Sequence, residues 1–437
     1  MMAGSTVVLT RLATVWPLQS DTQEFTFMTQ ATFQGFARDR LSRIDRFIDD
    51  KYIKSGKLPG AQLQILRKGE LVHQMVLGHA DLERGIPVTP ETVYRIYSMT
   101  KPITSLAFMM LVEQGLVALD DPVSRFIPEF KALAVFSAGI GPYITTRVSR
   151  QMQMVDLLRH TSGLTYGFQF RSNVDAAYRK KVLSDRAGPL DMAGFVDALA
   201  NLPLEFSPGD AWNYSVSTDV LGVLVQRISG QSFESFVKER ILDPLGMTET
   251  SFQVREDQRS RFAACYLPTP EAGLKLQDDP QTSVYLTPPV FHSGGGGLVS
   301  TIGDYAKFCQ MLVNRGQYKG HHLVAPATLR MMTANQLPGG ADLASMSRSM
   351  FSEATNAGVG FGLGFAVVFD PVKALVPSSV GEFYWGGAAS TAFWIDPVED
   401  IAVIFMTQLM GSATYPVRRE LRTLVYSALV EPNRMRD

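Results

Sequence analysis

Segments with strand character lie at the two ends of this 437-residue chain, and helical segments lie between them. Near the N-terminus, residues 61–77 are predicted to form a hairpin that turns at Lys68-Gly69. Near the C-terminus, segments rich in β-branched and aromatic residues predict antiparallel strands at 361–369, 382–385, 391–395 and 401–407. The sequence therefore predicts one antiparallel sheet that is built from both ends of the chain and flanked by helices.

The order of these segments predicts an α/β fold of the α+β type with a mainly helical insertion. We expect one α/β domain from residues 28–125 and 289–437, and one mainly helical domain from residues 126–288. Residues 1–27 lack a clear pattern and Met28 offers another start, so we expect a disordered or mis-started extension there. Helices are predicted at 36–52, 101–114, 155–159, 195–202, 218–228, 232–242 and 417–430.

The charge balance and the cysteine count exclude several classes of protein. A formal charge of −1 and a pI near 6.6 give no electrostatic footprint for nucleic acid or for an anionic membrane. The two cysteines, Cys265 and Cys309, have no CxxC spacing and are too few for a disulfide scaffold. A hydrophobic share of 46% with 19% charged residues is ordinary for a soluble globular protein.

No segment is predicted to cross a membrane. The apolar runs all fall well short of the roughly 20 residues that a spanning helix needs. The most suspicious N-terminal stretch, residues 6–17, contains Arg11 and follows no Lys or Arg, which argues against a secretory signal. We therefore expect no membrane partner and a cytoplasmic location.

A serine and a lysine stand three residues apart where a strand-like segment, 92–97, turns into an apolar helix. Residues i and i+3 share a helix face, so the hydroxyl of Ser98 and the amine of Lys101 can come within hydrogen-bond reach. A serine alkoxide there would also be stabilised by the positive end of the helix. This spacing alone is weak, because Ser235 and Lys238 repeat it within a helix, where we expect an ordinary surface pair.

Two further stretches are candidate parts of a site with Ser98. Tyr214 lies in Trp212-Asn213-Tyr214-Ser215-Val216, at a junction from loop to helix, from which its phenol could reach across a cleft. A packed aromatic side chain is the alternative account. Trp385-Gly386-Gly387-Ala388 ends a late strand, where glycines let a backbone N–H approach a ligand closely, and a β-bulge is the alternative.

Taken together and in this order, the three motifs resemble the serine β-lactamase and penicillin-binding protein superfamily. The resemblance runs from about Leu41 to the C-terminus and includes intermediate markers at 157–164, 208–209, 244–247 and 295–301. Where that superfamily carries Tyr-x-Asn and Lys-Thr-Gly, this chain has Tyr214-Ser215-Val216 and Trp385-Gly386-Gly387. Trp-Gly-Gly at this place is similar to the family VIII carboxylesterases, which are class C β-lactamase-like.

This resemblance implies a β-lactamase/transpeptidase-like fold and a serine hydrolase, a carboxylesterase for short-chain esters, that works through an acyl-enzyme on Ser98. Weak hydrolysis of cephalosporins is implied as a side activity. Lys101 and Tyr214 would move the protons, and the backbone N–H groups of Ser98 and Ala388 would form the oxyanion hole. Trp385, Gly386 and Gly387 would bind the substrate. No cofactor and no metal is implied; the partner is a small-molecule ester, and the sequence does not indicate the oligomeric state.

Other functions remain as alternatives. A β-lactamase or D-amino-acid peptidase is disfavoured by Trp385 and Val216, because a tryptophan in place of the lysine removes the cation that holds a substrate carboxylate. A penicillin-binding module that is acylated once and does not turn over is a second alternative.

Several other chemistries are disfavoured by missing motifs. A Ser-His-Asp hydrolase of the Gly-x-Ser-x-Gly type lacks its pentapeptide here, and we expect His160 and His292 to be loop or packing residues. There is no HExxH zinc motif, and no Gly-Lys-Ser/Thr follows the glycine run 294–297. Side chains that could line an acyl or alcohol pocket are Tyr166, Phe168, Phe170, Phe361 and Tyr384.

Overall fold

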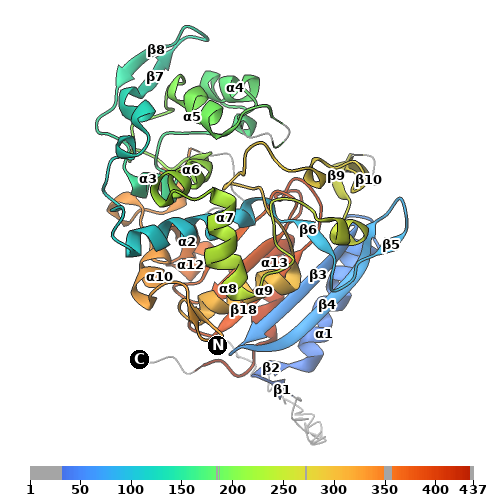
Figure 1. The fold of residues 1–437 in the computed structure, drawn as a ribbon. Coiled ribbons are helices and arrows are strands. Elements are labelled where there is room, and N and C mark those ends of the chain that lie inside the picture. The colour runs from blue at the N-terminus through green and yellow to red at the C-terminus, as the bar shows by residue number, and fades with distance from the viewer. Residues whose placement is uncertain (1–31, 184–185, 187, 271–272, 349–356, 434–437) are drawn as a thin grey trace, which may run out of the picture.

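A computed structural model describes residues 32–183, 186, 188–270, 273–348 and 357–433 of the chain. The extension predicted at 1–27 lies outside the described residues. At the centre of the molecule is an eight-stranded antiparallel sheet (Figure 1), whose strands run in the order β14 (Val359–Phe361), β15 (Ala366–Val368), β16 (Phe383–Gly386), β17 (Ala392–Asp396), β18 (Ile401–Met406), β3 (Gly60–Arg67), β4 (Glu70–Asp81) and β5 (Ile86–Pro87).

The two ends of the chain meet inside this sheet. Strand β18 pairs with β3 in a register that runs from Ile401 opposite Arg67 to Met406 opposite Gln62. The predicted hairpin turn at Lys68-Gly69 joins β3 to β4. The prediction of one antiparallel sheet built from both ends of the chain is confirmed.

One predicted strand is wrong in its extent. Residues 361–369 form a hairpin rather than one strand, because β14 ends at Phe361 and β15 begins at Ala366. The turn between them is closed by the N–H of Gly362, which donates to the carbonyl of Phe365 over 2.8 Å. Gly364 in this turn has a φ of 101°, a conformation that glycine adopts without strain.

Helices cover both faces of the sheet, and the alternation of side chains in β18 separates the two faces. Ile401, Val403 and Phe405 belong to a core with α1 (Arg38–Ile48) and α13 (Val417–Ala428). Ala402, Ile404 and Met406, which alternate with them, belong to the larger core that contains α2 (Thr100–Glu113) and α9 (Ile302–Val313). This period of two is the pattern of a strand that is buried on both faces.

Helix α2 is the most deeply buried helix near the site. Every residue from Thr100 to Leu111 is buried, so the helix is enclosed on all sides. It is packed against α6 (Ser217–Ser229) and α7 (Phe233–Val237). A helix held from every side gives the residues at its N-terminus a fixed position.

Residues 126–288, for which the sequence predicts a mainly helical domain, contain helices and also hairpins. In Figure 1 the part of this segment that ends with α6 lies above the sheet, and α7 lies in front of the sheet. Besides α6 and α7, its helices are α3 (Met154–Leu158), α4 (Asn173–Lys180), α5 (Met192–Ala200) and α8 (Asp243–Leu245). Its hairpins, which the sequence reading did not predict, pair β7 (Ala134–Ala138) with β8 (Ile144–Arg147) and β9 (Cys265–Thr269) with β10 (Gly273–Asp278).

The proposed division into two domains stays a prediction. One large hydrophobic cluster includes buried residues from both proposed domains.

The remaining elements are short. They are β1 (Thr32–Phe33), β2 (Phe36–Ala37), β6 (Val93–Arg95), β11 (Val299–Thr301), β12 (Gln317–Tyr318), β13 (His321–His322), α10 (Pro326–Met332), α11 (Leu343–Met346) and α12 (Pro371–Ala374).

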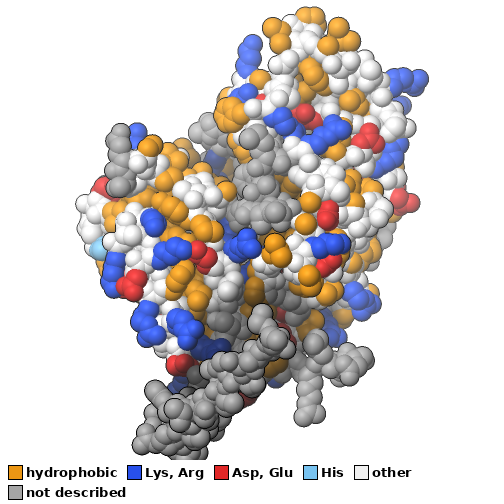
Figure 2. All heavy atoms as spheres, turned by 180° about the vertical axis from the view of Figure 1, so that it is seen from behind, with side chains coloured by type: hydrophobic (Ala, Val, Ile, Leu, Met, Phe, Trp, Pro, Cys, Tyr) orange, Lys and Arg blue, Asp and Glu red, His pale blue; other side chains and the backbone are white. Residues whose placement is uncertain are grey.

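The surface carries charges of both signs. On the face drawn in Figure 2, Lys and Arg side chains are interspersed with Asp and Glu side chains. Within the described ranges, the helices are too short or too polar to pass through a bilayer.

Two carboxyl groups are buried together beside β16: Glu382, which directly precedes this strand, and Asp396, which ends the neighbouring strand β17. Glu382 and Asp396 have no exposed surface, and the phenol oxygen of Tyr426 lies within hydrogen-bond distance of both, 2.7 Å from Glu382 Oε2 and 2.6 Å from Asp396 Oδ2. A phenol has one proton to donate, so one of the two carboxyls must itself be protonated to make the second bond. Burial raises the pKa of Glu382 to about 7, although the guanidinium of Arg422 lies 3.1 Å away and opposes the shift.

Glu382→Gln is expected to flatten part of the pH dependence of stability. A carboxyl whose pKa rises from 4.5 to about 7 on folding contributes stability below pH 4.5, and this contribution is lost as the pH rises through 7. Between these limits the wild type is expected to lose roughly 3 kcal/mol of unfolding free energy through this group, a loss that the variant lacks. Urea unfolding across this pH range measures it; equal slopes for both proteins would contradict a protonated Glu382.

Candidate active site

The nucleophile candidate sits in a sharp turn between β6 and α2. A short 3₁₀ turn, Tyr97–Met99, connects the two elements, and Tyr97 has a φ of 42°, which is strained for a non-glycine residue. The turn is held on both sides, because the N–H of Ile96 donates to Leu298 O over 3.2 Å and the N–H of Met99 donates to Ile96 O over 3.0 Å. The turn presents Ser98, half-buried, to a cavity.

The amine of Lys101 lies behind Ser98 and is almost fully buried, with 2% of the residue exposed. Its Nζ is 3.3 Å from Ser98 Oγ, 3.0 Å from the Tyr166 hydroxyl and 2.6 Å from the Gly295 carbonyl. These three contacts use the three free positions of a tetrahedral nitrogen. An ammonium would donate to all three oxygens, whereas a neutral amine would donate to Tyr166 and Gly295 and accept the proton of Ser98.

Tyr214 is brought to the same place by the loop that precedes α6. Its side chain is buried, and the Lys101 nitrogen lies 4.6 Å from the centroid of its ring. Its carbonyl accepts a hydrogen bond of 3.0 Å from the Gln169 side chain, which fixes the loop. Tyr214 and Ser98 both line one cavity. The structure thus brings together the three side chains that the sequence singled out.

His160 packs beside Tyr214 in the core. It is buried, its ring contacts those of Trp212, Tyr214 and Phe361, and its Nδ1 lies 3.2 Å from Ser215 Oγ. Burial, with the charge of Lys101 nearby, holds the pKa of His160 well below its usual range. The imidazole is therefore neutral near neutral pH, in agreement with the predicted packing role.

The strand that ends in two glycines forms the other wall of the cavity. Trp385, Gly386, Gly387 and Ala388 all line it together with Ser98. A Cβ added at Gly387 would lie 2.6 Å from the carbonyl oxygen of Ile96, so glycine allows this strand to approach the chain just before the serine. Within the described part of the chain, the N–H of Ala388 makes no hydrogen bond, so it is available to a ligand beside Ser98.

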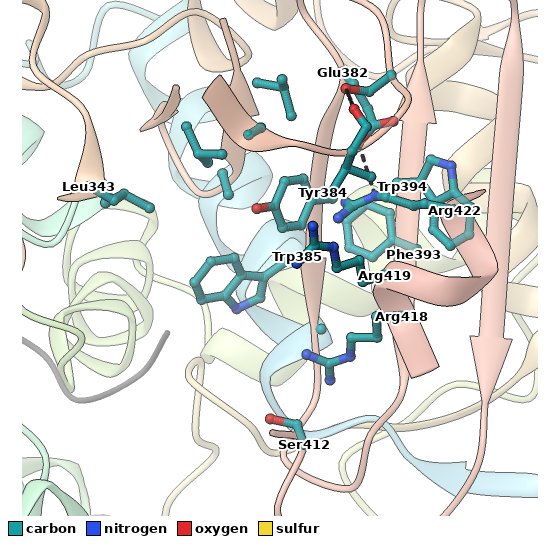
Figure 3. A pocket seen from close by; sticks show the side chains of 18 of the residues that line it. Leu343, Glu382, Tyr384, Trp385, Phe393, Trp394, Ser412, Arg418, Arg419 and Arg422 are labelled. Carbon is teal, nitrogen blue, oxygen red and sulfur yellow. Dashed lines mark hydrogen bonds and ion pairs between the residues drawn. The ribbon is translucent and has the colours of Figure 1, made fainter. Parts of the chain in front are cut away.

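Arg418 of α13 supports this wall from the opposite face of the sheet. Its guanidinium donates to the carbonyls of Gly387 over 2.8 Å and Thr391 over 2.7 Å. It fills the space that a side chain at Gly386 would take. In Figure 3 the indole of Trp385 points toward the side of the cavity where Leu343 lies, away from Trp394 and Arg422.

Two residues near Lys101, Tyr166 and Asp219, were not predicted from the sequence to take part in the polar contacts of the site. Tyr166 was considered only as a wall of a pocket, and Asp219 was not considered. Asp219 Oδ1 accepts hydrogen bonds from Ser293 Oγ over 2.5 Å and from the N–H of Gly295 over 2.9 Å, while Oδ2 lies 3.5 Å from the Tyr166 hydroxyl. The signal that could have found Asp219 is its position as the one acidic residue of helix α6, directly before the apolar run Val220–Val225.

Burial is the main cause of the pKa shifts of Asp219 and Tyr166, the two titratable groups that form the polar contacts behind Lys101. Burial raises the pKa of Asp219, against the attraction of the Lys101 charge, and it raises the pKa of Tyr166 well above its usual range. Among the described residues, no three His, Cys, Asp or Glu side chains are grouped as a metal site. The arrangement therefore offers a hydroxyl, an amine and phenols for proton transfer, and backbone N–H groups for an oxyanion.

Gly387→Ala is expected to separate the two walls of the cavity. The added methyl would collide with Ile96 O and with Thr391 Oγ1, so β16 must move away from Ser98. If the N–H groups of Ser98 and Ala388 bind the same oxyanion, the loss of one donor lowers kcat about 100-fold. Steady-state kinetics with an activated ester measure the effect. Gly303→Ala is the matched control, because a Cβ there meets nothing within 4 Å. The kcat of this control should not change. A Gly387→Ala enzyme with wild-type kcat would contradict the proposed geometry.

The chain is similar to proteins of one sequence family along most of its length. The sequence model of the family described as Beta-lactamase matches residues 44–427. Protein Rv1367c of Mycobacterium tuberculosis is 37% identical over 358 residues, which cover 81% of this chain and 86% of that protein. Esterase EstB of Burkholderia gladioli is 30% identical over 425 residues, which cover 92% of this chain and 100% of that protein.

A solved structure shows the same likeness in three dimensions. EstCE1, described as a hydrolase with promiscuous acyltransferase activity, superposes with a TM-score of 0.74 at 25% identity. The match covers 89% of this chain and 99% of that chain. The predicted β-lactamase/transpeptidase-like fold is confirmed.

Proposed function

We propose that this chain, which belongs to the beta-lactamase family, is a serine hydrolase of short-chain carboxylic esters. Its expected likeness to the family VIII carboxylesterases is confirmed by the match to Esterase EstB. The observation that carries the proposal is the contact of 3.3 Å between Lys101 Nζ and Ser98 Oγ at the edge of the cavity. A buried amine beside a hydroxyl is the pairing that activates a serine without a histidine.

Acylation begins when Lys101, as a neutral amine, takes the proton of Ser98. The Ser98 oxygen attacks the ester carbonyl, and the carbonyl π electrons move to its oxygen. The N–H groups of Ser98 and Ala388 stabilise this oxyanion, and each such donor contributes about 3 kcal/mol in enzymes of this kind. Because Ser98 is at the N-terminus of α2, the positive end of the helix acts in the same direction.

Tyr214 completes the cycle in this proposal. The Lys101 nitrogen lies 4.6 Å from the centroid of the Tyr214 ring, so the two side chains are neighbours in the site. Tyr214 then protonates the leaving alkoxide and, after the alcohol departs, activates the water that hydrolyses the acyl-enzyme. Lys101 and Tyr214 therefore divide the proton transfers of the cycle between them.

The wall at residue 385 favours esters over anionic β-lactams. Trp385 supplies an indole where the Lys-Thr-Gly lysine of the superfamily supplies a cation, and its ring packs against Tyr214 and Phe361. The cavity is lined by apolar side chains that include Ala366, Val368 and Phe393. Its three arginines, Arg418, Arg419 and Arg422, already contact protein carbonyls or the Glu382 carboxyl. An uncharged acyl or alcohol group is therefore the better fit, and weak cephalosporin hydrolysis remains a side activity of the same acylation chemistry.

Ser98→Ala, Lys101→Ala and Tyr214→Phe are each expected to abolish most ester turnover. Loss of the nucleophile should lower kcat for p-nitrophenyl butyrate by more than about 1000-fold, and loss of either proton-transfer group by about 100- to 10,000-fold. The matched control is Ser235→Ala, the second Ser-x-x-Lys serine, which lies on α7 outside the cavity and should retain full activity. Near wild-type turnover in any of the first three variants would remove that residue from the mechanism.

A parallel assay separates ester hydrolysis from the two alternatives. Wild-type enzyme is expected to turn over p-nitrophenyl butyrate rapidly and a chromogenic cephalosporin feebly. Faster turnover of the cephalosporin would indicate a β-lactamase. A single stoichiometric burst with each substrate, without steady turnover, would indicate a penicillin-binding module. A cytoplasmic location and the chain length of the natural ester stay predictions.

A further inference from the structure

A continuous chain of polar contacts leads from the nucleophile into the core. Ser98 Oγ contacts Lys101 Nζ at 3.3 Å, Lys101 Nζ contacts the Tyr166 hydroxyl at 3.0 Å, and that hydroxyl lies 3.5 Å from Asp219 Oδ2. Lys101, Tyr166 and Asp219 are each at most 5% exposed. The chain ends at a carboxylate on α6 that the proposed reaction does not use.

We propose that Asp219 is a positioning residue that accepts a proton from Lys101 through the Tyr166 hydroxyl, so that Lys101 faces Ser98 as a neutral amine. This inference rests on the proposed function of Ser98 and Lys101. It assigns Tyr166 the bridging role, and it explains how a lysine becomes a base without leaving a buried charge unpaired.

The proton count of the relay is balanced. The Lys101 ammonium gives one proton to the Tyr166 oxygen as the Tyr166 O–H proton passes to Asp219 Oδ2. Lys101 becomes a neutral amine, Asp219 becomes a neutral carboxylic acid, and Tyr166 remains a phenol. When Ser98 attacks the ester, its proton moves to the Lys101 lone pair, and the negative charge moves to the carbonyl oxygen. No oxidant or other co-reactant is needed.

The surroundings of Asp219 fit this role. Its Oδ1 is held by two donors, Ser293 Oγ and the N–H of Gly295, while Oδ2 is directed at Tyr166. The same Gly295 gives its carbonyl to Lys101, so one residue fixes both ends of the relay. The loop is clamped to α2 as well, because Thr104 Oγ1 donates to Gly294 O over 2.8 Å.

Low solvent access favours the neutral pair over the ion pair. Moving the proton from Lys101 to Asp219 replaces two buried charges by two neutral groups, which lowers the desolvation cost. Burial also raises the pKa of Asp219, which is the direction that the transfer needs. The other titratable groups that face this cluster are Tyr214 and His160 beside Lys101, and His292, which pairs with Glu234 next to Ser293.

A permanently ionised Asp219 would have the opposite effect on catalysis. A fixed carboxylate would stabilise the Lys101 ammonium and so oppose its action as a base. Its neutralisation would then leave activity unchanged or move the acidic limb of the pH profile to lower pH. The two accounts therefore differ in the sign of a measurable shift.

Asp219→Asn tests the relay, because the amide preserves the shape and an acceptor oxygen but cannot accept the proton. The relay predicts that kcat/KM for p-nitrophenyl butyrate is nearly independent of pH around neutrality in the wild type. In the variant the ammonium must lose its proton to solvent, so kcat/KM should be about 100-fold lower near pH 7 and should rise about tenfold per pH unit. Wild-type activity, or an acidic limb displaced to lower pH, would overturn the relay.

Two further variants separate the relay from a loss of structure. Tyr166→Phe removes the bridge and should reproduce the same pH profile, while a flat profile would contradict the bridging role. Asp304→Asn changes another buried carboxylate, which accepts from the N–H of Glu249 and the hydroxyl of Thr250, away from the cavity lining. It should lower the thermal unfolding midpoint but leave the pH profile unchanged. If it alters the profile as Asp219→Asn does, the relay account is wrong.

A probe that needs no ester turnover keeps the relay and the proposed function distinguishable. A fluorophosphonate reacts once with an activated serine, forming the Ser98 Oγ–phosphorus bond with loss of fluoride. Mass spectrometry of the intact protein gives the labelling rate. If the wild type is labelled but does not turn over esters, the proposed function fails, and the relay still predicts slower, pH-dependent labelling of Asp219→Asn. Equal labelling rates for both proteins overturn the relay alone, and an unlabelled wild type overturns both.

Discussion

The burial of one amine is the constraint on which the rest of the site depends. Lys101 is enclosed by α2, by the aromatic rings of Tyr166 and Tyr214, and by the Gly295 carbonyl, and its nitrogen contacts the nucleophile. In water a lysine is charged and cannot act as a base. Inside this core it is held next to Ser98 with every polar contact filled by a protein oxygen. The chemistry of the site follows from that enclosure.

The fold provides the enclosure from parts that are distant in the sequence. Helix α2 is buried against α6 and α7, in a core that it shares with the central sheet, and the inserted segment contributes Tyr166, Tyr214 and Asp219. The close approach of Gly387 to Ile96 then brings the strand of Trp385 to the serine. A glycine at position 387 allows this approach, and the strained turn at Tyr97 presents the serine to it.

The sequence predicted what local periodicity and short motifs encode. The hairpin at Lys68-Gly69, helix α2 and the contact of Ser98 with Lys101 were predicted because their signals are local. Hairpin β7–β8 was missed because β8 is exposed along its whole length and has no buried face to create a period of two. Tyr166 was missed because its contact with Lys101 joins residues 65 apart in the chain, and Asp219 because its contact with Tyr166 joins residues 53 apart. Only tertiary packing creates such contacts.

The central claim is that Ser98 becomes covalently acylated. Its most direct measurement is acid quenching of the enzyme during turnover of p-nitrophenyl butyrate, followed by digestion and mass spectrometry. The account predicts one butyryl group on the peptide that contains Ser98, at a level that rises in variants with slowed deacylation such as Tyr214→Phe. A butyryl group on another residue, or steady turnover with no adduct in either protein, would contradict it.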